Sequence, residues 1–150
     1  MAELLEITAG KFTFRVAADR LYSPEGVWVR PESAARVRLG LTDFMQQHSG
    51  DVAFLSVKPA GTSLRAGDDF AELETVKVNL GVQVPVGGTV VEVNAALEPT
   101  PEVVNEDPYG EGWLAVIEPA SWEPDRAKLL DARAYLEVVR SRVEQELKAQ

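Results

Sequence analysis

The stretch Val78-Asn79-Leu80-Gly81-Val82-Gln83-Val84-Pro85-Val86 carries an apolar residue at every second position. This is the period of a strand with one buried face, because successive side chains of a strand point to opposite faces. The preceding residues 70–76 are also rich in residue types that favour strands. We therefore predict a β-hairpin whose tip carries Lys77, with the amine exposed to solvent.

Most of the remaining chain up to about residue 120 predicts further short strands. Alternating or β-branched residues indicate strands at 27–30, 36–41, 51–57, 89–93 and 112–117, with a helical turn near 101–104. One short internal helix is expected at 42–50, because Thr42 can cap its start and Gly50 can end it. His48, the only histidine, lies in this segment, and we assign it no role. The predicted fold class is therefore mainly β.

The two ends of the chain carry other patterns. Residues 12–16 alternate like a strand, which we expect to pair with an edge of the β region. From Pro124 the apolar residues recur every three or four positions, which predicts one helix that continues to about Lys148, capped by Ser121 or Asp125. Its apolar stripe comprises Leu129, Ala132, Leu136, Val139, Val143 and Leu147. We expect the helix to pack through Leu129, Leu136 and Val139.

The composition excludes several classes of protein. A chain of 150 residues with 45% hydrophobic and 26% charged residues is typical of a soluble globular domain. The net charge of -9 argues against binding to nucleic acid, whose phosphates would repel it. No apolar run approaches bilayer length and no targeting signal is evident, so we expect a cytoplasmic monomer without a membrane association. The absence of cysteine excludes disulfides, thiolate metal sites and thiol nucleophiles.

Two separated motifs carry a family resemblance. Glu74-Thr75-Val76-Lys77, followed by Pro85-Val86-Gly87-Gly88-Thr89-Val90-Val91-Glu92-Val93-Asn94, resembles the lipoyl-attachment segment of glycine cleavage system H proteins. The block Asn105-Glu106-Asp107-Pro108-Tyr109-Gly110-Glu111-Gly112-Trp113-Leu114 is similar to the family's signature ahead of its last strand. Its proline and glycines predict a tight turn with a structural role. Two motifs in the family's order are more specific than one, and the resemblance covers roughly residues 21–139.

The resemblance implies a fold and a division of the chain. The expected architecture is the barrel-sandwich hybrid of biotinyl and lipoyl carriers, with a short internal helix and a C-terminal α-helix. Residues 1–20 would form an N-terminal extension and residues 21–120 the lipoyl-carrier domain. Residues 121–150 would form a C-terminal helix that packs on this domain or extends from it.

The resemblance also implies a site and a function. Lys77 would carry lipoate in covalent linkage, and Glu74, Thr75, Val76 and Val78 would flank it as recognition residues, with no catalytic or metal-binding residue. The chain would be a carrier and not an enzyme. It would shuttle an aminomethyl group on lipoyl-lysine from glycine decarboxylase to aminomethyltransferase. The other implied partners are dihydrolipoamide dehydrogenase, which reoxidises the arm, and a lipoate ligase or lipoyl transferase, which loads it.

Three alternatives remain open. Biotin carriers share the hairpin but usually place methionine on both sides of the lysine, whereas Val76 and Val78 stand here, which favours lipoate. H proteins typically carry His-Glu where this chain has Gly26-Val27, so an H-like lipoyl carrier in sulfur oxidation or lipoate relay is the second candidate. An enzyme or an unmodified binding barrel is the third, but the sequence contains no recognisable nucleophile, metal cluster or phosphate loop to support catalysis.

Overall fold

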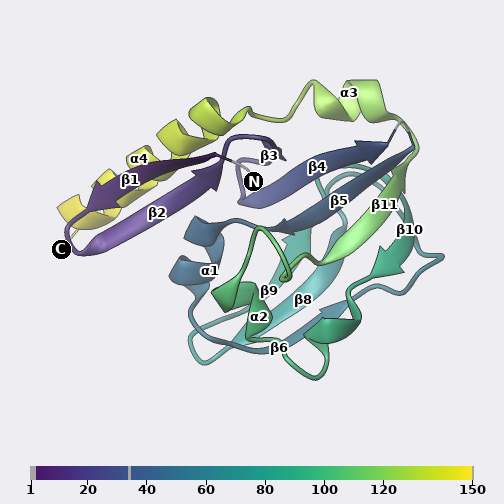
Figure 1. Cartoon of the computed structure of the whole chain (residues 1–150), viewed down its shortest axis with the longest axis horizontal. Helices are drawn as coiled ribbons and strands as arrows, with labels where there is room; N and C mark the ends of the chain where they lie inside the picture. Colours follow the sequence, from purple (N-terminus) through teal and green to yellow (C-terminus); the bar gives the residue numbers. More distant parts are fainter. Residues whose placement is uncertain (1–2, 34, 150) are drawn as a thin grey trace.

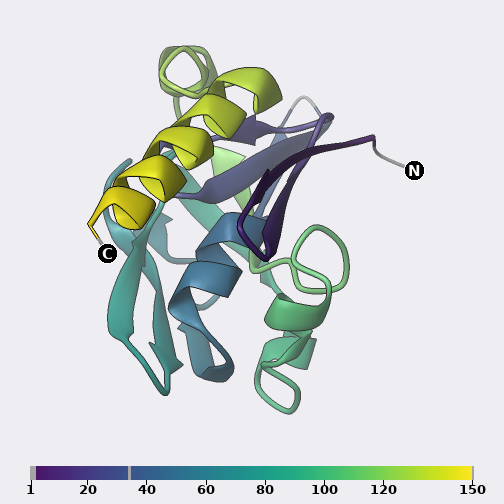
Figure 2. The ribbon, with the colours of Figure 1, turned by 90° about the vertical axis from the view of Figure 1, so that its left-hand side faces the viewer.

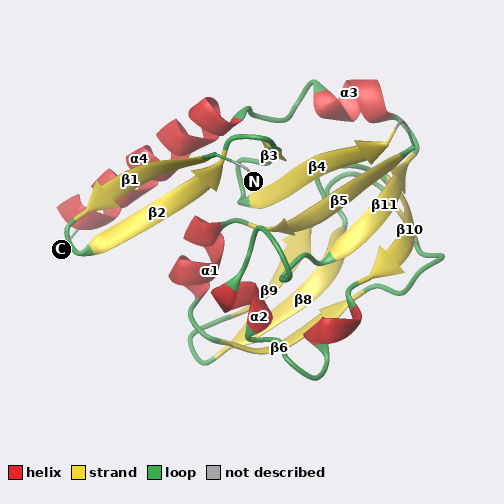
Figure 3. Cartoon of the chain, viewed as in Figure 1, coloured by secondary structure: helices red, strands yellow, loops and turns green. Residues whose placement is uncertain are grey.

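The main body of the fold consists of two antiparallel sheets with an apolar core between them, and a separate two-stranded sheet lies outside it. A computed structural model describes residues 3–33 and 35–149. The larger sheet has the order β3-β4-β5-β11-β10-β7, and the smaller sheet has the order β6-β8-β9. The larger sheet comprises β3 (Leu21–Tyr22), β4 (Val27–Ser33), β5 (Arg36–Leu41), β11 (Ala115–Pro119), β10 (Gly88–Val93) and β7 (Ser63–Leu64). The smaller sheet comprises β6 (Val52–Val57), β8 (Asp69–Thr75) and β9 (Asn79–Gln83). The two sheets do not close into a continuous barrel, and the predicted mainly β class is confirmed (Figure 3).

The predicted alternation places the core between the sheets. Val82, Val84 and Val86 are buried, as are Leu73 from the neighbouring strand and Leu39 from the larger sheet, and all five belong to one cluster. The intervening polar side chains face solvent, because a one-residue step along a strand changes the face. The hydrophobic pattern thereby fixes which side of the hairpin faces water.

Short helices connect the strands. Helix α1 (Asp43–Ser49) is capped by the Thr42 side chain, which accepts a hydrogen bond from the Met45 N–H at 3.2 Å. It ends at Gly50, whose φ of 91° is readily adopted only by glycine. The predicted internal helix is thus confirmed. A 3₁₀ turn, η1 (Ala95–Leu97), and helix α2 (Val103–Glu106) follow β10.

The N-terminal segment departs from the prediction. Strand β2 (Phe12–Ala17) does not pair with an edge of the β domain; it pairs with β1 (Leu4–Ala9) in a separate two-stranded sheet. Phe14 and Val16 on its inner face belong to a buried cluster with residues of α1 and the C-terminal helix. Figure 1 shows the β1–β2 hairpin beside the C-terminal helix. The prediction was wrong because an alternating pattern specifies a half-buried strand without specifying its partner.

The predicted C-terminal helix is confirmed, but its predicted start near Pro124 was wrong, because two helices occupy this region. Helix α3 (Trp122–Arg126) contains Pro124 in its first turn, where the missing N–H costs no helical hydrogen bond. The helical conformation then ends, since Leu130 exchanges two backbone hydrogen bonds of 2.8 Å with Tyr22. Helix α4 (Ala132–Lys148) is capped by Asp131, whose carboxylate accepts a hydrogen bond from the Ala134 N–H at 2.8 Å.

The other expected caps serve different purposes or none. Asp125 is buried, and its carboxylate accepts a hydrogen bond from the Gly87 N–H at 3.0 Å, while Ser121 makes no side-chain capping bond. This contact ties α3 to the turn before β10.

The packing face of α4 agrees with the predicted stripe at Ala132, Val139 and Val143 but includes Tyr135 in place of Leu136. The buried positions are Ala132, Tyr135, Val139 and Val143. Leu136 is only half-buried, and Leu129 lies ahead of α4, where it packs against the core between the sheets. The Tyr135 ring stacks on Tyr22 with centroids 4.7 Å apart. Its hydroxyl lies 2.8 Å from Thr42 Oγ1, so α4 is joined to the start of α1.

Candidate functional site

The sequence-predicted lysine lies at the tip of the β8–β9 hairpin. Residues Val76, Lys77 and Val78 connect the two strands, and the Thr75 N–H donates to the Val78 carbonyl at 2.8 Å. Lys77 is exposed. In Figure 2 this hairpin projects in teal at one end of the molecule, next to α1. The predicted hairpin and the exposure of its tip are therefore confirmed.

The Thr75 side chain fixes the conformation of this tip. Its hydroxyl oxygen accepts from the Lys77 N–H at 3.1 Å and from the Val78 N–H at 2.9 Å. The same hydroxyl donates to the Ser49 carbonyl at 2.7 Å, and Thr75 is 7% exposed. Thr75 therefore holds the turn and joins it to the end of α1 from inside the protein, while its side chain is not on the surface.

The Lys77 amine has one polar neighbour. Nζ donates to the His48 carbonyl at 3.2 Å, and no carboxylate within the described ranges lies at salt-bridge distance from it. Acylation would remove the positive charge without breaking an ion pair. The amide would retain one N–H, which is sufficient for the same carbonyl. The environment of Lys77 thus fits an amide-linked group.

The flanking residues divide into an outward set and an inward set. Glu72 and Glu74 are exposed on one face of β8, whereas Leu73 and Thr75 point inward. Val76 is 94% exposed beside the lysine, and Val78 is half-buried. The outward set therefore presents carboxylates and one valine next to Lys77.

Sequence reasoning missed Phe54. This residue lies opposite Glu74 in the β6–β8 pairing and is 68% exposed. The signal was available: Phe54 and Leu55 are adjacent in a predicted strand, so only one of them can face the core. An exposed phenylalanine therefore lies on the outer face of this sheet, beside Glu74.

His48 also lies closer to the site than expected. Its ring Nε2 is 2.7 Å from the Glu146 carboxylate of α4, and its carbonyl accepts from Lys77. Because the ring faces α4 and the backbone faces the lysine, the end of α1 bridges the hairpin tip and the C-terminal helix. The histidine contributes to positioning and makes no contact that indicates catalysis.

A small hollow of about 190 Å³ lies beside the lysine, lined on one side by apolar residues and also by Gln47, His48 and Glu146. Its walls include Phe12 and Phe14 of β2, Phe44 of α1 and Val143 of α4, and Lys77 itself is part of the lining. An uncharged, largely apolar group on Nζ would therefore have an apolar surface next to its point of attachment.

Gly26 and Val27 occupy constrained positions. Gly26 has φ of +107°, and an added Cβ would lie 3.2 Å from Met45 Cβ. Val27 is 2% exposed and belongs to the core between the sheets. A histidine at Gly26 would be strained, and a glutamate at Val27 would place its carboxylate in an apolar environment. In this chain the two positions support packing.

The block from Asp107 to Trp113 forms the tight turn that was predicted. The Asp107 carboxylate accepts from the Glu111 N–H at 2.8 Å, and Trp28 donates through Nε1 to the Pro108 carbonyl at 2.9 Å. The Tyr109 hydroxyl donates to the Arg15 carbonyl at 2.7 Å. Burial raises the pKa of Tyr109 above its ordinary range. These contacts hold the N-terminal hairpin against the β domain, so the block has a structural use.

The part of the chain that the structure describes has no metal-binding cluster and no membrane-spanning helix. Within those residues, no group of three or more His, Asp or Glu side chains is arranged to hold a metal ion. No described helix combines the length and apolar character needed to cross a membrane. Among the described residues, the lysine-bearing hairpin is the candidate site that the geometry supports.

Comparisons of this sequence with known proteins all indicate the same family. The profile of the glycine cleavage H-protein family matches residues 20–142. The glycine cleavage system H protein of Salinibacter ruber is 45% identical over 121 residues, which are 80% of this chain and 95% of that protein. The same-named protein of Thermus thermophilus is 41% identical over 126 residues, 84% of this chain and 97% of its own length.

A solved structure agrees with the sequence comparisons. The crystal structure of a glycine cleavage system H protein from Mycobacterium marinum superposes with a TM-score of 0.70 at 32% identity. The match covers 79% of this chain and 94% of that one. A profile that spans most of the chain and relatives of this identity establish the family. This chain belongs to the glycine cleavage H-protein family.

Proposed function

We propose that this protein is the non-catalytic lipoyl carrier of a glycine cleavage system and that Lys77 is the residue that carries lipoate. The observation that supports this most is an exposed amine, free of ion pairs among the described residues, on a turn fixed by three hydrogen bonds of Thr75. When bound, lipoate supplies a redox-active disulfide at the end of a long arm.

The protein's own residues position the arm and leave the chemistry to its partners. The Lys77 Nζ remains next to the His48 carbonyl after acylation, because one N–H is retained. A rigid turn keeps the attachment atom at a defined place, and a tether raises the effective concentration of the arm at each partner. The hollow beside Lys77 offers a resting surface for the arm.

The partners follow from the chemistry of a glycine cleavage system. A lipoate ligase or lipoyl transferase loads Lys77, glycine decarboxylase and aminomethyltransferase use the arm in turn, and dihydrolipoamide dehydrogenase reoxidises it. Glu72, Glu74 and the exposed Val76 surround the lysine and form the surface that the loading enzyme meets.

Exchange of labelled bicarbonate into glycine by a glycine decarboxylase tests the function. We expect the lipoylated protein to support exchange and the unmodified protein to give only background. Loading of Lys77 without exchange would contradict the glycine cleavage role and favour a lipoyl carrier of sulfur oxidation or lipoate relay. Exchange supported equally by unmodified protein would contradict the carrier role altogether.

A further inference from the structure

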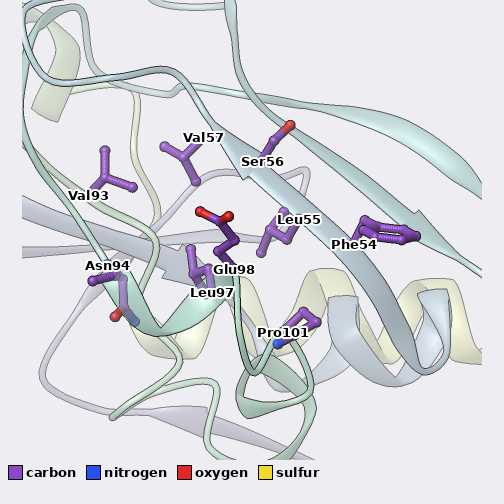
Figure 4. A pocket seen from close by; sticks show the side chains of 10 residues that line it. Phe54, Leu55, Ser56, Val57, Val93, Asn94, Leu97, Glu98 and Pro101 are labelled. Atoms are coloured by element: carbon purple, nitrogen blue, oxygen red, sulfur yellow. The ribbon is translucent and has the colours of Figure 1, made fainter.

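An open groove lies on the smaller sheet, between β6 and the end of β10. It measures about 590 Å³ and is lined by residues of β6 on one side and of the β10–η1 segment on the other (Figure 4). Neither Lys77 nor the other residues of its turn line the groove, whereas Phe54 on the outer face of β6 does. It is therefore a second surface with its own chemistry.

Strand β6 presents an unpaired edge to this groove. It is the outermost strand of its sheet and pairs only with β8. The Lys58 N–H donates to the Phe70 carbonyl at 2.8 Å. Because bonding residues alternate along an antiparallel strand, the backbone groups of the even-numbered β6 residues bond to β8. Those of the odd-numbered β6 residues face away from β8. Leu55 and Val57 therefore direct their N–H and C=O groups outward. Within the described residues, these groups have no other hydrogen-bond partner.

The opposite wall offers a further pair of free groups. Strand β10 pairs with β7 only at Gly88 and Thr89. The Asn94 N–H donates to the Leu114 carbonyl at 3.1 Å, so alternation directs the backbone of Val93 away from β11. Both walls thus carry outward-facing peptide groups next to apolar side chains, which is the arrangement that accepts an added strand.

The charge of the groove determines which kind of added strand would bind there. Glu98 is the only ionisable residue in the lining, and Figure 4 shows its carboxylate between Leu55, Val57 and Val93. A second copy of this chain also carries a net charge of -9, so charge repulsion opposes its approach. A segment with lysine or arginine alternating with apolar residues would instead complement both the carboxylate and the apolar walls.

We propose that this groove binds an extended basic segment of a partner protein, which adds to β6 as a fourth strand of the smaller sheet. The site does not depend on lipoylation of Lys77, so its failure leaves the carrier function untouched. The backbone groups of Leu55 and Val57 supply hydrogen bonds, and Glu98 supplies the preference for positive charge.

The test uses the full chain and a capped peptide of about six residues that alternates lysine and valine. Peptide is titrated into labelled protein, and amide exchange is followed by NMR. We expect saturable binding with slower exchange at Leu55 and Val57. Exchange of the Ser56 amide should stay unchanged, because its N–H already bonds to β8. A peptide with glutamate in place of lysine should bind about tenfold more weakly or worse.

Matched charge variants locate the site. Glu98→Lys should weaken binding of the lysine peptide about fivefold, while Glu102→Lys, an equal charge change on a nearby exposed residue outside the lining, should leave it within about twofold. Several results would overturn the proposal: no saturable binding, protection at β9 or the Lys77 turn, equal effects of the two variants, or protection that appears with protein concentration alone. The last would identify a second copy as the occupant.

Discussion

Two hairpins of this protein each carry a lysine at the tip, and only one of the two is built to present it. Lys11 follows Gly10, whose φ is +61°, in the turn between β1 and β2. The side-chain hydrogen bond nearest that turn joins the exposed Thr8 and Thr13 hydroxyls at 3.1 Å. The Lys77 turn is instead held by a buried threonine hydroxyl and belongs to a three-stranded sheet.

This difference shows that exposure is not the distinguishing property. Both amines lie on exposed residues, and both hairpins contact α1. The β1–β2 sheet has only two strands, however, whereas the β8–β9 hairpin shares its sheet with β6 and its turn is held by a buried hydroxyl. A loading enzyme that recognises a fixed backbone geometry can distinguish the two lysines. The comparison therefore predicts that presentation of the amine, and not its accessibility, decides which lysine is used.

The largest effect is expected from replacing the two lysines in turn. Lys77→Arg keeps the charge but removes the acylatable amine, so glycine–bicarbonate exchange should fall to the background of unmodified protein. Lys11→Arg should leave exchange at the level of the parent protein. Exchange that persists in Lys77→Arg would show that the comparison favours the wrong hairpin.

A second pair of variants tests the turn itself. Thr75→Val removes three hydrogen bonds and leaves backbone groups near the tip without their partner, which should cost about 1 to 3 kcal/mol of unfolding free energy. The initial rate of lipoate loading should fall as well. Thr13→Val in the other hairpin should cost less than about 0.5 kcal/mol and should not change loading. Urea unfolding and initial loading rates measure both quantities; equal effects of the two variants would contradict the role of Thr75.

Variants in α4 separate the stability of the first hairpin from the lysine site. Val139 is fully buried against β2 and α1, so Val139→Ala should cost about 2 kcal/mol, whereas the half-buried Leu136 should cost only about 1 kcal/mol on change to alanine. Neither variant should slow loading of Lys77. If Leu136→Ala proves the more costly change in urea unfolding, the packing face of α4 described here is wrong.

The smallest effect concerns alkaline pH. Burial raises the pKa of Tyr135 from 10.0 to about 12, and burial also raises the pKa of Tyr22. The unfolded chain therefore loses these protons first, so stability should fall as pH rises from about 10 towards 12.

The location of the tyrosines indicates which part of the protein should be destabilised first at alkaline pH. Tyr22 and Tyr109 donate hydrogen bonds to backbone carbonyls of β2. The protection of the β1–β2 amides against exchange should therefore be lost at lower pH than the protection of the β8–β9 amides. Tyr135→Phe should reduce the slope of unfolding free energy against pH. An unchanged slope would remove Tyr135 from the explanation.

Local patterns predicted the elements more reliably than their partners. The alternation from Val78 to Val86 gave the hairpin, its buried face and the exposed Lys77, because these follow from a period of two and a turn. The pairing of β1 with β2 was not predictable from the same pattern, since any open edge accepts an alternating strand. The break before α4 depends on the bridge between Tyr22 and Leu130, which lie far apart in sequence.

The site was predicted in part for the same reason. Motif resemblance pointed to Lys77 and its neighbours, but the contact between Thr75 and Ser49 joins residues that only the fold brings together. One missed feature was within reach: Asp131 immediately before Ala132 is an ordinary N-cap signal, and weighing it against Asp125 would have placed the start of α4 correctly.

The central claim is that Lys77 is the carrier lysine, and the position of the adduct tests it most directly. The full chain is incubated with lipoate, ATP and a lipoate ligase, and its intact mass and proteolytic peptides are then analysed. We predict one lipoyl group per chain, confined to the peptide that contains Lys77. A lipoyl group on Lys11 or any other lysine, or no adduct on correctly folded protein, would contradict the account.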